Sequence, residues 1–181
     1  MTHSHATQRG FTLIEVLVTL VIVSIGVMGA VALQLNSLRA SDAALSRTRA
    51  TLLAEGIVER VRANPSAEAL AIYNVGESTD PVLGSGARGR VECTASACSA
   101  GDWAKRDLWD IDQQLQREGA TSMLDGLPEG RACIVVSDQR VTADVVWQGS
   151  GGGDVTLTDC GRDVISSGRR AVRIESAVVT P

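Results

Sequence analysis

The sequence is poor in histidine and has no excess of basic residues, and each shortage argues against a class of function. Its only histidines, His3 and His5, lie near the start, so residues 11–181 contain none. Without histidine that part of the chain lacks a Ser/His/Asp or Cys/His catalytic set, and we expect no enzymatic activity. The formal charge at pH 7 is −4, whereas affinity for a nucleic-acid backbone comes from clustered Lys and Arg. We therefore expect no nucleic-acid partner.

The cysteines lack the spacing of a zinc site. They are Cys93, Cys98, Cys133 and Cys160, and no histidine lies near them. A cytosolic zinc site is thus disfavoured, and we expect neither a metal nor a cofactor. If this part of the chain is exported, an even number of cysteines indicates two disulfides, for which three pairings exist.

What the sequence does contain is one long apolar segment near its start. From Phe11 to Leu35 the only ionisable residue is Glu15, and a helix of this length spans a hydrocarbon core of about 30 Å. The segment is too long and continuous for a discarded secretory signal. Arg9 precedes it, so the positive-inside rule favours a cytoplasmic N-terminus and places the rest outside the cytoplasm. A carboxylate in lipid costs about 2.5–3.5 kcal/mol, which indicates a function for Glu15.

The helical pattern continues beyond the apolar segment. Apolar residues recur at spacings close to three, four or seven, and they are Leu38, Leu45, Leu52, Leu53, Ile57 and Val61. Such a stripe needs a surface to pack on. Asn64-Pro65 ends the pattern, because proline disfavours helical backbone in the residue before it. The sequence therefore predicts one helix from Phe11 to Ala63, roughly 80 Å long at 1.5 Å per residue.

The segment after this helix is rich in loop-forming residues. Residues 68–92 contain Asp80-Pro81 and several glycines, which favour turns. Residues 84–89 match G-x-G-x-x-G by letter, but they lack the preceding strand and following helix of a dinucleotide site. We expect loops both here and in the glycine-rich run 149–153.

A short helix is expected near residue 102. Asp102 is suited to cap it, and its apolar stripe consists of Ala104, Leu108, Ile111 and Leu115. Nearby acidic residues do not follow the spacing of a calcium-binding loop. A solvated helix face is therefore predicted for Asp107, Asp110 and Asp112.

Strands are expected in the C-terminal part. Residues 131–137 and 140–148 read as strands joined by a turn at Asp138-Gln139, and residues 170–180 supply another. One face of the second strand carries Val141, Ala143, Val145 and Trp147. The predicted fold class is α+β, with a small antiparallel sheet in residues 64–181 packed on the amphipathic half of the helix.

The expected sheet favours one of the three disulfide pairings. Cys93 and Cys98 are sequence neighbours that close readily, and a Cys133–Cys160 bond joins the sheet to its C-terminal return. The loop-entropy estimate gives about 2 kcal/mol for the short ring and about 3.6 kcal/mol for the long one.

The run Gly10-Phe11-Thr12-Leu13-Ile14-Glu15 resembles the class III signal of type IV pilins and pseudopilins. The resemblance implies that a prepilin peptidase cuts between Gly10 and Phe11 and methylates the new terminal amine of Phe11. It also implies that Glu15 pairs with the terminal amine of a neighbouring subunit in a filament, which offsets the desolvation of its carboxylate. Ala32 stands where many major pilins have a proline.

Later landmarks are similar to the PilV-type minor pilins. They are the helix end from Leu53 to Pro65, then Cys93 and Cys98, Asp107-Leu108-Trp109, Leu127-Pro128 with Gly130, and Trp147. The resemblance implies a low-abundance component that primes pilus assembly, sits near the tip with other minor pilins and an adhesin, and serves cell adhesion and twitching motility. The alternatives are a minor pseudopilin of a type II secretion system and a DNA-uptake pilin. The DNA-uptake alternative requires a basic patch, suggested only by Arg169, Arg170 and Arg173.

This resemblance divides the chain into four parts. Residues 1–10 are the leader, residues 11–35 the transmembrane half of the helix, residues 36–63 its amphipathic half, and residues 64–181 a periplasmic head with disulfides. The implied location is the inner membrane, followed by the pilus at the cell surface. The implied partners are the prepilin peptidase, other minor pilins and the major pilin.

Overall fold

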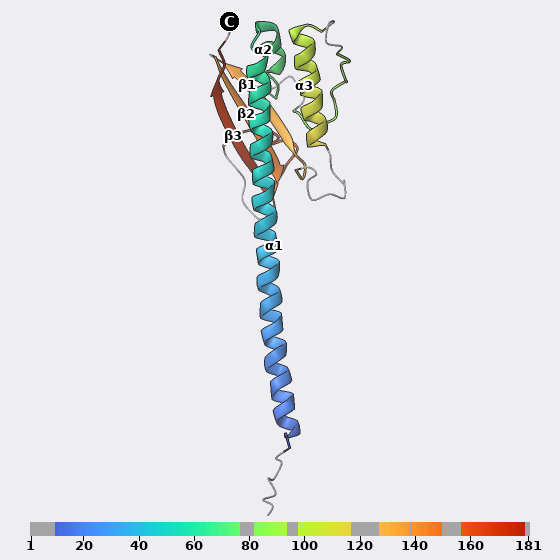
Figure 1. Ribbon diagram of the computed structural model, residues 1–181, viewed down its shortest axis with the longest axis vertical. Coiled ribbons are helices and arrows are strands. Elements are labelled where there is room, and N and C mark those ends of the chain that lie inside the picture. The colour runs from blue at the N-terminus through green and yellow to red at the C-terminus, as the bar shows by residue number, and fades with distance from the viewer. Residues whose placement is uncertain are drawn as a thin grey trace, which may run out of the picture. The chain divides into compact units, whose positions relative to one another are not determined.

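The structure is a computed structural model of the chain, and it describes residues 10–76, 82–93, 98–116, 127–137, 139–149 and 157–179. The chain divides into two compact units, one up to Asp42 and one from Ala43 onward. Helix α1 belongs to both, and the other elements belong to the second unit. Figure 1 shows α1 (Leu13–Ala63), α2 (Ala67–Tyr73), α3 (Ala100–Leu115), β1 (Arg131–Ser137), β2 (Arg140–Gln148) and β3 (Arg169–Ala177). The predicted α+β class, with a long N-terminal helix and a small antiparallel sheet, is confirmed.

Helix α1 begins slightly later than predicted and ends where the sequence indicated. Phe11 and Thr12 lie in non-helical backbone before Leu13, and Ala63 is the last helical residue, next to Asn64-Pro65. In the first unit the side chains of α1 are exposed. Among the described residues, α1 is the one helix long and apolar enough to cross a membrane, judged by length and composition.

The C-terminal part of α1 packs on the sheet through a narrower stripe than predicted. Ala50, Ala54, Ile57, Val58 and Val61 are buried and join the main core. The predicted stripe is correct for Ile57 and Val61 but wrong for three leucines, which are 61%, 41% and 63% exposed, namely Leu38, Leu45 and Leu52. They follow a seven-residue spacing along another side of the helix. The first buried positions of this stripe are the alanines Ala50 and Ala54, and not the leucines.

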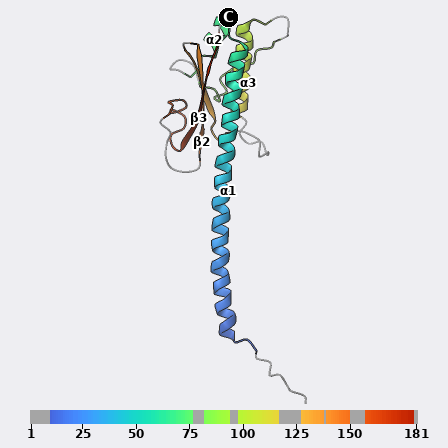
Figure 2. The ribbon, with the colours of Figure 1, turned by 60° about the vertical axis from the view of Figure 1, so that its left-hand side comes forward.

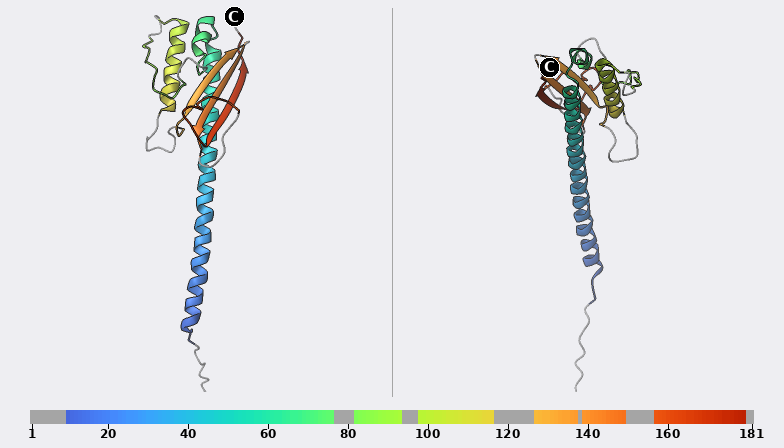
Figure 3. Two further views of the ribbon diagram at one scale, coloured as in Figure 1. Left: turned by 180° about the vertical axis from the view of Figure 1, so that it is seen from behind. Right: turned by 45° about the horizontal axis from the view of Figure 1, so that its top comes forward.

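The sheet is antiparallel, with strand order β1-β2-β3. Strands β1 and β2 have the predicted bounds, while β3 begins at Arg169 and ends at Ala177. Between β1 and β2, Gln139 adopts a φ of 62°, and Asp138 lies outside the described residues. One face of β2 belongs to the main core together with buried residues of α1, as predicted. The β2 residues on this face are Val141, Ala143, Val145 and Trp147. Figures 2 and 3 show the sheet beside the C-terminal part of α1.

The opposite face of the sheet is also covered. Val146 packs there with Cys133, Cys160 and Ile165 in a second cluster. Strand β2 is therefore buried on both faces along most of its length. Asp144, near its centre, is buried as well and needs hydrogen-bonding partners for its carboxylate.

Two predictions were wrong for α2 and α3, the helices that follow α1 along the chain. Residues 68–92 were predicted to be rich in loops, but α2 includes residues 68–73 and is capped by the Ser66 side chain, which accepts from Ala69 N at 3.2 Å. Ser99, not Asp102, is the N-cap of α3. The predicted apolar stripe of α3 is confirmed, because Ala104, Leu108, Ile111 and Leu115 are all buried.

Candidate functional site

The segment that resembles a processing signal lies open at the start of α1. Gly10 and Phe11 are exposed and non-helical, and Phe11 has 84% of its surface accessible. A Cβ added to Gly10 would meet no atom within 4 Å. The fold of this chain therefore does not require glycine at position 10, and any requirement for it comes from another molecule.

Glu15 lies in the first turn of α1. Its backbone N–H donates to the Thr12 carbonyl at 3.1 Å, and its side chain is exposed. A carboxylate at this end of a helix is favoured by the positive end of the helix dipole. Around it the exposed side chains are apolar, including Leu13, Ile14 and Val16. Glu15 is thus a single acid on an apolar surface.

The structure contains two disulfides, with the pairing that the sequence favoured. Cys93 is bonded to Cys98 with a Cα–Cα distance of 5.6 Å, and Cys133 to Cys160 with a distance of 5.8 Å. The first closes a short ring immediately before α3. The second joins β1 to the segment that precedes β3, and it lies in the cluster behind the sheet.

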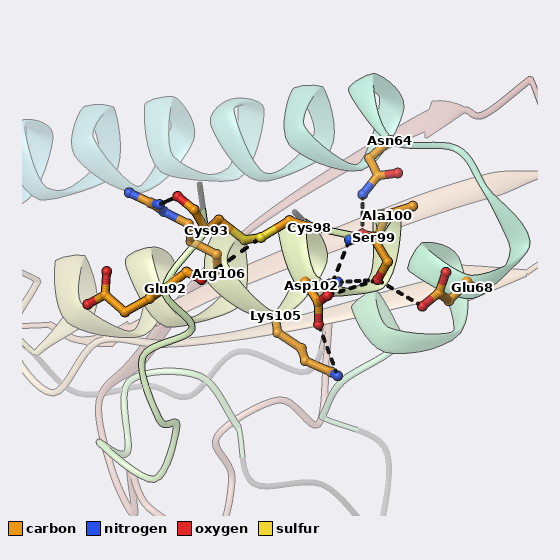
Figure 4. Close-up of a disulfide and its surroundings, with 10 residues drawn as sticks. All are labelled: Asn64, Glu68, Glu92, Cys93, Cys98, Ser99, Ala100, Asp102, Lys105 and Arg106. Atoms are coloured by element: carbon orange, nitrogen blue, oxygen red, sulfur yellow. Dashed lines mark hydrogen bonds and ion pairs between the residues drawn. A yellow bond between two sulfur atoms is a disulfide. The ribbon is translucent and has the colours of Figure 1, made fainter. Parts of the chain in front are cut away.

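Helix α3 starts beside the Cys93–Cys98 disulfide, and Figure 4 shows how its first turn is held. Ser99 Oγ accepts from Asp102 N at 3.1 Å, and Ser99 N donates to Asp102 Oδ2 at 3.2 Å. The hydrogen bond from the Ser99 backbone lowers the pKa of Asp102 most, and the hydrogen bond from the Ser99 side chain lowers it further. Asn64 Nδ2 donates to the Ala100 carbonyl at 2.7 Å. The start of α3 is thereby tied to the end of α1.

A second polar contact joins three helices. Tyr73 of α2 is fully buried, and its hydroxyl donates to Asp107 of α3. Burial, and then the Asp107 carboxylate, raise the pKa of Tyr73 above its ordinary value. Arg60 of α1 lies 3.6 Å from Asp107 Oδ1. The prediction of a solvated face is therefore wrong for Asp107, whose side chain links α1, α2 and α3.

Asp112 departs further from that prediction. It is fully buried, it accepts from Gly84 N at 2.6 Å, and it accepts from the Gln116 side-chain amide. Its carboxylate holds the loop at residue 84 on the end of α3. Of the three acids, Asp110 is the most solvated, with 37% of its side chain exposed, compared with 25% for Asp107. Within the described residues no group of His, Cys, Asp and Glu is arranged to hold a metal ion.

Of the arginines near the C-terminus that suggested a basic patch, Arg169 and Arg173 make contacts within the head. Arg169 is fully buried, and its Nη1 donates to the Cys160 carbonyl at 2.8 Å. Arg173 donates to both Asp144 oxygens, at 2.7 and 2.8 Å, and this bonding raises the pKa of Arg173. Thr158 also donates to Asp144, at 2.6 Å. These contacts hold the Cys160 segment on the sheet.

The contacts of three polar residues were not predicted, because their partners are distant along the chain. These residues are Arg60, Tyr73 and Asp144. Asp144 stands opposite Arg173 in the β2–β3 register, so an acid in the middle of an apolar strand was the available signal. For Tyr73 a signal also existed. It is the only tyrosine, and a buried hydroxyl needs a partner.

Two family models match the chain. The model described as Tt1218-like, type IV pilin Tt1218, matches residues 32–109, and the model of the prokaryotic N-terminal methylation motif matches residues 5–31. No curated protein and no solved structure matches the chain. The two models cover the apolar part of α1, its amphipathic part and most of α3. Together with the long apolar helix and the small antiparallel sheet, they support a type IV pilin-like protein of the kind that a prepilin peptidase processes.

Proposed function

We propose that this pilin-like protein is a minor pilin of the PilV type that takes part in priming, assembly and tip structure of type IV pili. The observation that carries the proposal is the segment from Gly10 to Glu15, an open glycine followed by an apolar helix with one acid in its first turn. The match to the methylation motif over residues 5–31 supports it. The PilV-like order of later landmarks supports the minor-pilin assignment.

Cleavage falls between Gly10 and Phe11 in this proposal. A protease needs extended backbone in its cleft, and Gly10, Phe11 and Thr12 are non-helical and exposed. Glycine adds no side chain to the cleft and adopts extended backbone readily. Phe11 then becomes the methylated N-terminus.

Glu15 supplies the assembly contact. In the described part of the chain its side chain has no hydrogen bond or ion pair, and apolar side chains surround it. When helices pack in a membrane or a filament, an unpaired carboxylate carries a large desolvation cost. The terminal amine of a neighbouring subunit offsets that cost and sets the axial position of the incoming helix. The head then lies on the periplasmic side until the subunit enters the pilus.

The processing step is tested by intact mass and N-terminal sequencing of membrane-extracted protein, from cells with and without the prepilin peptidase. We expect a chain that starts at methylated Phe11 only when the peptidase is present. Gly10→Leu should leave the full precursor. Gly89→Leu is the matched control, because Gly89 also has no atom within 4 Å of an added Cβ. A precursor starting at Met1 in both strains would overturn the proposal.

The pilus assignment is tested against the secretion alternative by deleting the protein. Loss of surface pili with normal export of secreted enzymes supports a minor pilin. Normal piliation with lost export would assign the chain to a type II secretion pseudopilus instead.

A further inference from the structure

A groove between α1 and α3 is left open on the second unit. It has a volume of about 300 Å³, and its walls include Arg49, Leu52, Leu53, Gly56, Ile111 and Gln114. Half of the lining residues are leucine or isoleucine, and Leu52 is 63% exposed. Covering this apolar surface with another molecule would be favourable, since apolar area in contact with water raises the free energy.

The groove beside Gly56 is not filled by any described residue of this chain. Gly56 lies inside the helix, where glycine is among the poorest formers of helical backbone. An added Cβ at Gly56 would meet no atom within 4 Å. Neither helix stability nor a close contact within the described residues therefore accounts for glycine here. A surface kept free of side chains allows another backbone or a bulky side chain to come close.

Arg49 supplies a charge to the same groove. Its Nη2 atom is buried and has no hydrogen-bond partner within the described part of the chain. A buried guanidinium nitrogen without an acceptor is unfavourable, so turning the Arg49 side chain outward into the groove costs little, and a carboxylate is the acceptor that then suits it best. Arg60 also lines the groove, but it already lies 3.6 Å from Asp107 and 3.9 Å from Asp110. The uncompensated donor is therefore Arg49.

From these observations we infer that the α1–α3 groove is a docking site for a segment of a different pilin-like subunit that carries an acidic residue next to an aliphatic one. The carboxylate binds Arg49, and the aliphatic side chain lies over Gly56 between Leu52 and Ile111. The identity of the partner as a subunit rests on the proposed function. The chemistry of the groove does not.

The groove is tested on the full chain in detergent micelles, with isovalerate as a carboxylate joined to a branched aliphatic group. We expect isovalerate to shift the methyl NMR signals of Leu52 and Ile111. Isovaleramide, its neutral isostere, should bind at least about tenfold more weakly, because a charge-assisted bond is lost. Arg49→Gln should remove this difference. Equal shifts with both compounds, or shifts only elsewhere, would overturn the inference even if the protein proves to be a minor pilin.

The partner is tested in cells. A photo-crosslinking residue at Leu52 should join the chain to a peptide of another pilin-like subunit with an Asp or Glu beside an aliphatic residue. Gly56→Leu fills the groove without touching the core and should reduce the adduct at least about tenfold. Glu55→Leu, at an exposed α1 position outside the groove, should not reduce it. An adduct only with a second copy or with lipid would overturn the inference, whereas failure of the wild-type chain to enter any filament would count against the proposed function.

Discussion

At the scale of single residues, the buried polar groups of the head have partners from distant parts of the chain. Asp144 is 4% exposed, and it holds Arg173 and Thr158 on the face of the sheet that carries Cys133–Cys160. Each partner satisfies an oxygen that burial would otherwise leave without a hydrogen bond. The stability of this face therefore depends on a few specific side chains.

Arg173→Met should lower the free energy of unfolding by about 3 kcal/mol, because it leaves Asp144 buried without its cation. Arg140→Met is the control on the same sheet. Arg140 pairs with Glu175 at 3.4 Å, but both side chains are largely exposed, so its loss should cost less than about 1 kcal/mol. Urea unfolding of the oxidised protein, followed by tryptophan fluorescence, measures both values. Equal losses would contradict the role given to Asp144.

Asp102 should make a pH-dependent contribution to stability. The pKa of Asp102 in the folded protein lies below its ordinary value, chiefly because the Ser99 backbone N–H donates to the carboxylate. A lowered folded pKa means that the contribution is complete above the unfolded value and is lost as pH falls through the folded one.

Thermal unfolding of the wild type and Asp102→Ala between pH 2 and pH 7 tests this contribution. The wild type should have the higher Tm at pH 7, and the difference should shrink toward zero in acid. A difference that stays constant down to the lowest pH would show that the capping box acts without the charge of Asp102.

At the scale of elements, the loop at residue 84 is anchored between α3 and β1. Gly84 N donates to Asp112, and Leu83 pairs with Ala132 of β1 through hydrogen bonds of 3.0 and 3.1 Å. Gly84 has a φ of +95°, and an added Cβ would lie 2.3 Å from the Gly130 carbonyl oxygen. The glycine that begins the G-x-G-x-x-G lookalike therefore serves backbone packing, in agreement with its interpretation as a loop.

Gly84→Ala should destabilise the head by at least about 1–3 kcal/mol, the usual cost of a left-handed conformation for a residue with a Cβ. The clash with Gly130 adds to this cost. Gly89→Ala, in the same loop, meets open space and should change stability by less than about 0.5 kcal/mol. Thermal unfolding of the two variants compares them directly. Equal Tm values would mean that the loop shifts freely away from α3.

At the scale of the whole molecule, α1 serves two environments. Up to Asp42 it presents apolar side chains with a single acid near its start, and from Ala43 onward it carries a buried stripe that completes the head. One continuous helix therefore supplies both an apolar surface that no described residue covers and a wall of the core. Assembly into a larger body is the expected fate of the first surface.

Glu15→Ala should leave processing intact but reduce incorporation into pili by roughly tenfold, which corresponds to about 1.4 kcal/mol of lost pairing. The ratio of processed protein in sheared pili to that in membranes measures incorporation. Glu55→Ala, another exposed acid on α1, is the control and should incorporate normally. Wild-type incorporation of the Glu15 variant would remove the assembly role proposed for this carboxylate.

Much of the fold follows from local patterns in the sequence. The end of α1 at Ala63, the bounds of β1 and β2, and the buried stripe of α3 were all predicted. These features depend on proline's restriction of the residue before it and on side-chain periodicity, which neighbouring residues specify without the rest of the chain. The processing segment at Gly10 is likewise a linear motif, readable without any fold.

Only the tertiary structure decided which apolar and acidic residues are buried. Packing in the head buries Ala50 and Ala54 of α1 and leaves Leu45 and Leu52 exposed, because burial depends on which side of the helix faces the core and not on the hydrophobicity of the side chain alone. Asp112 is buried through a backbone amide from residue 84, which no periodicity reveals. Helix α2 was missed because so short a helix has little stability of its own and depends on its Ser66 cap and its packing against α3. The sequence determined the elements and the processing motif, while long-range packing decided the contacts that build the head.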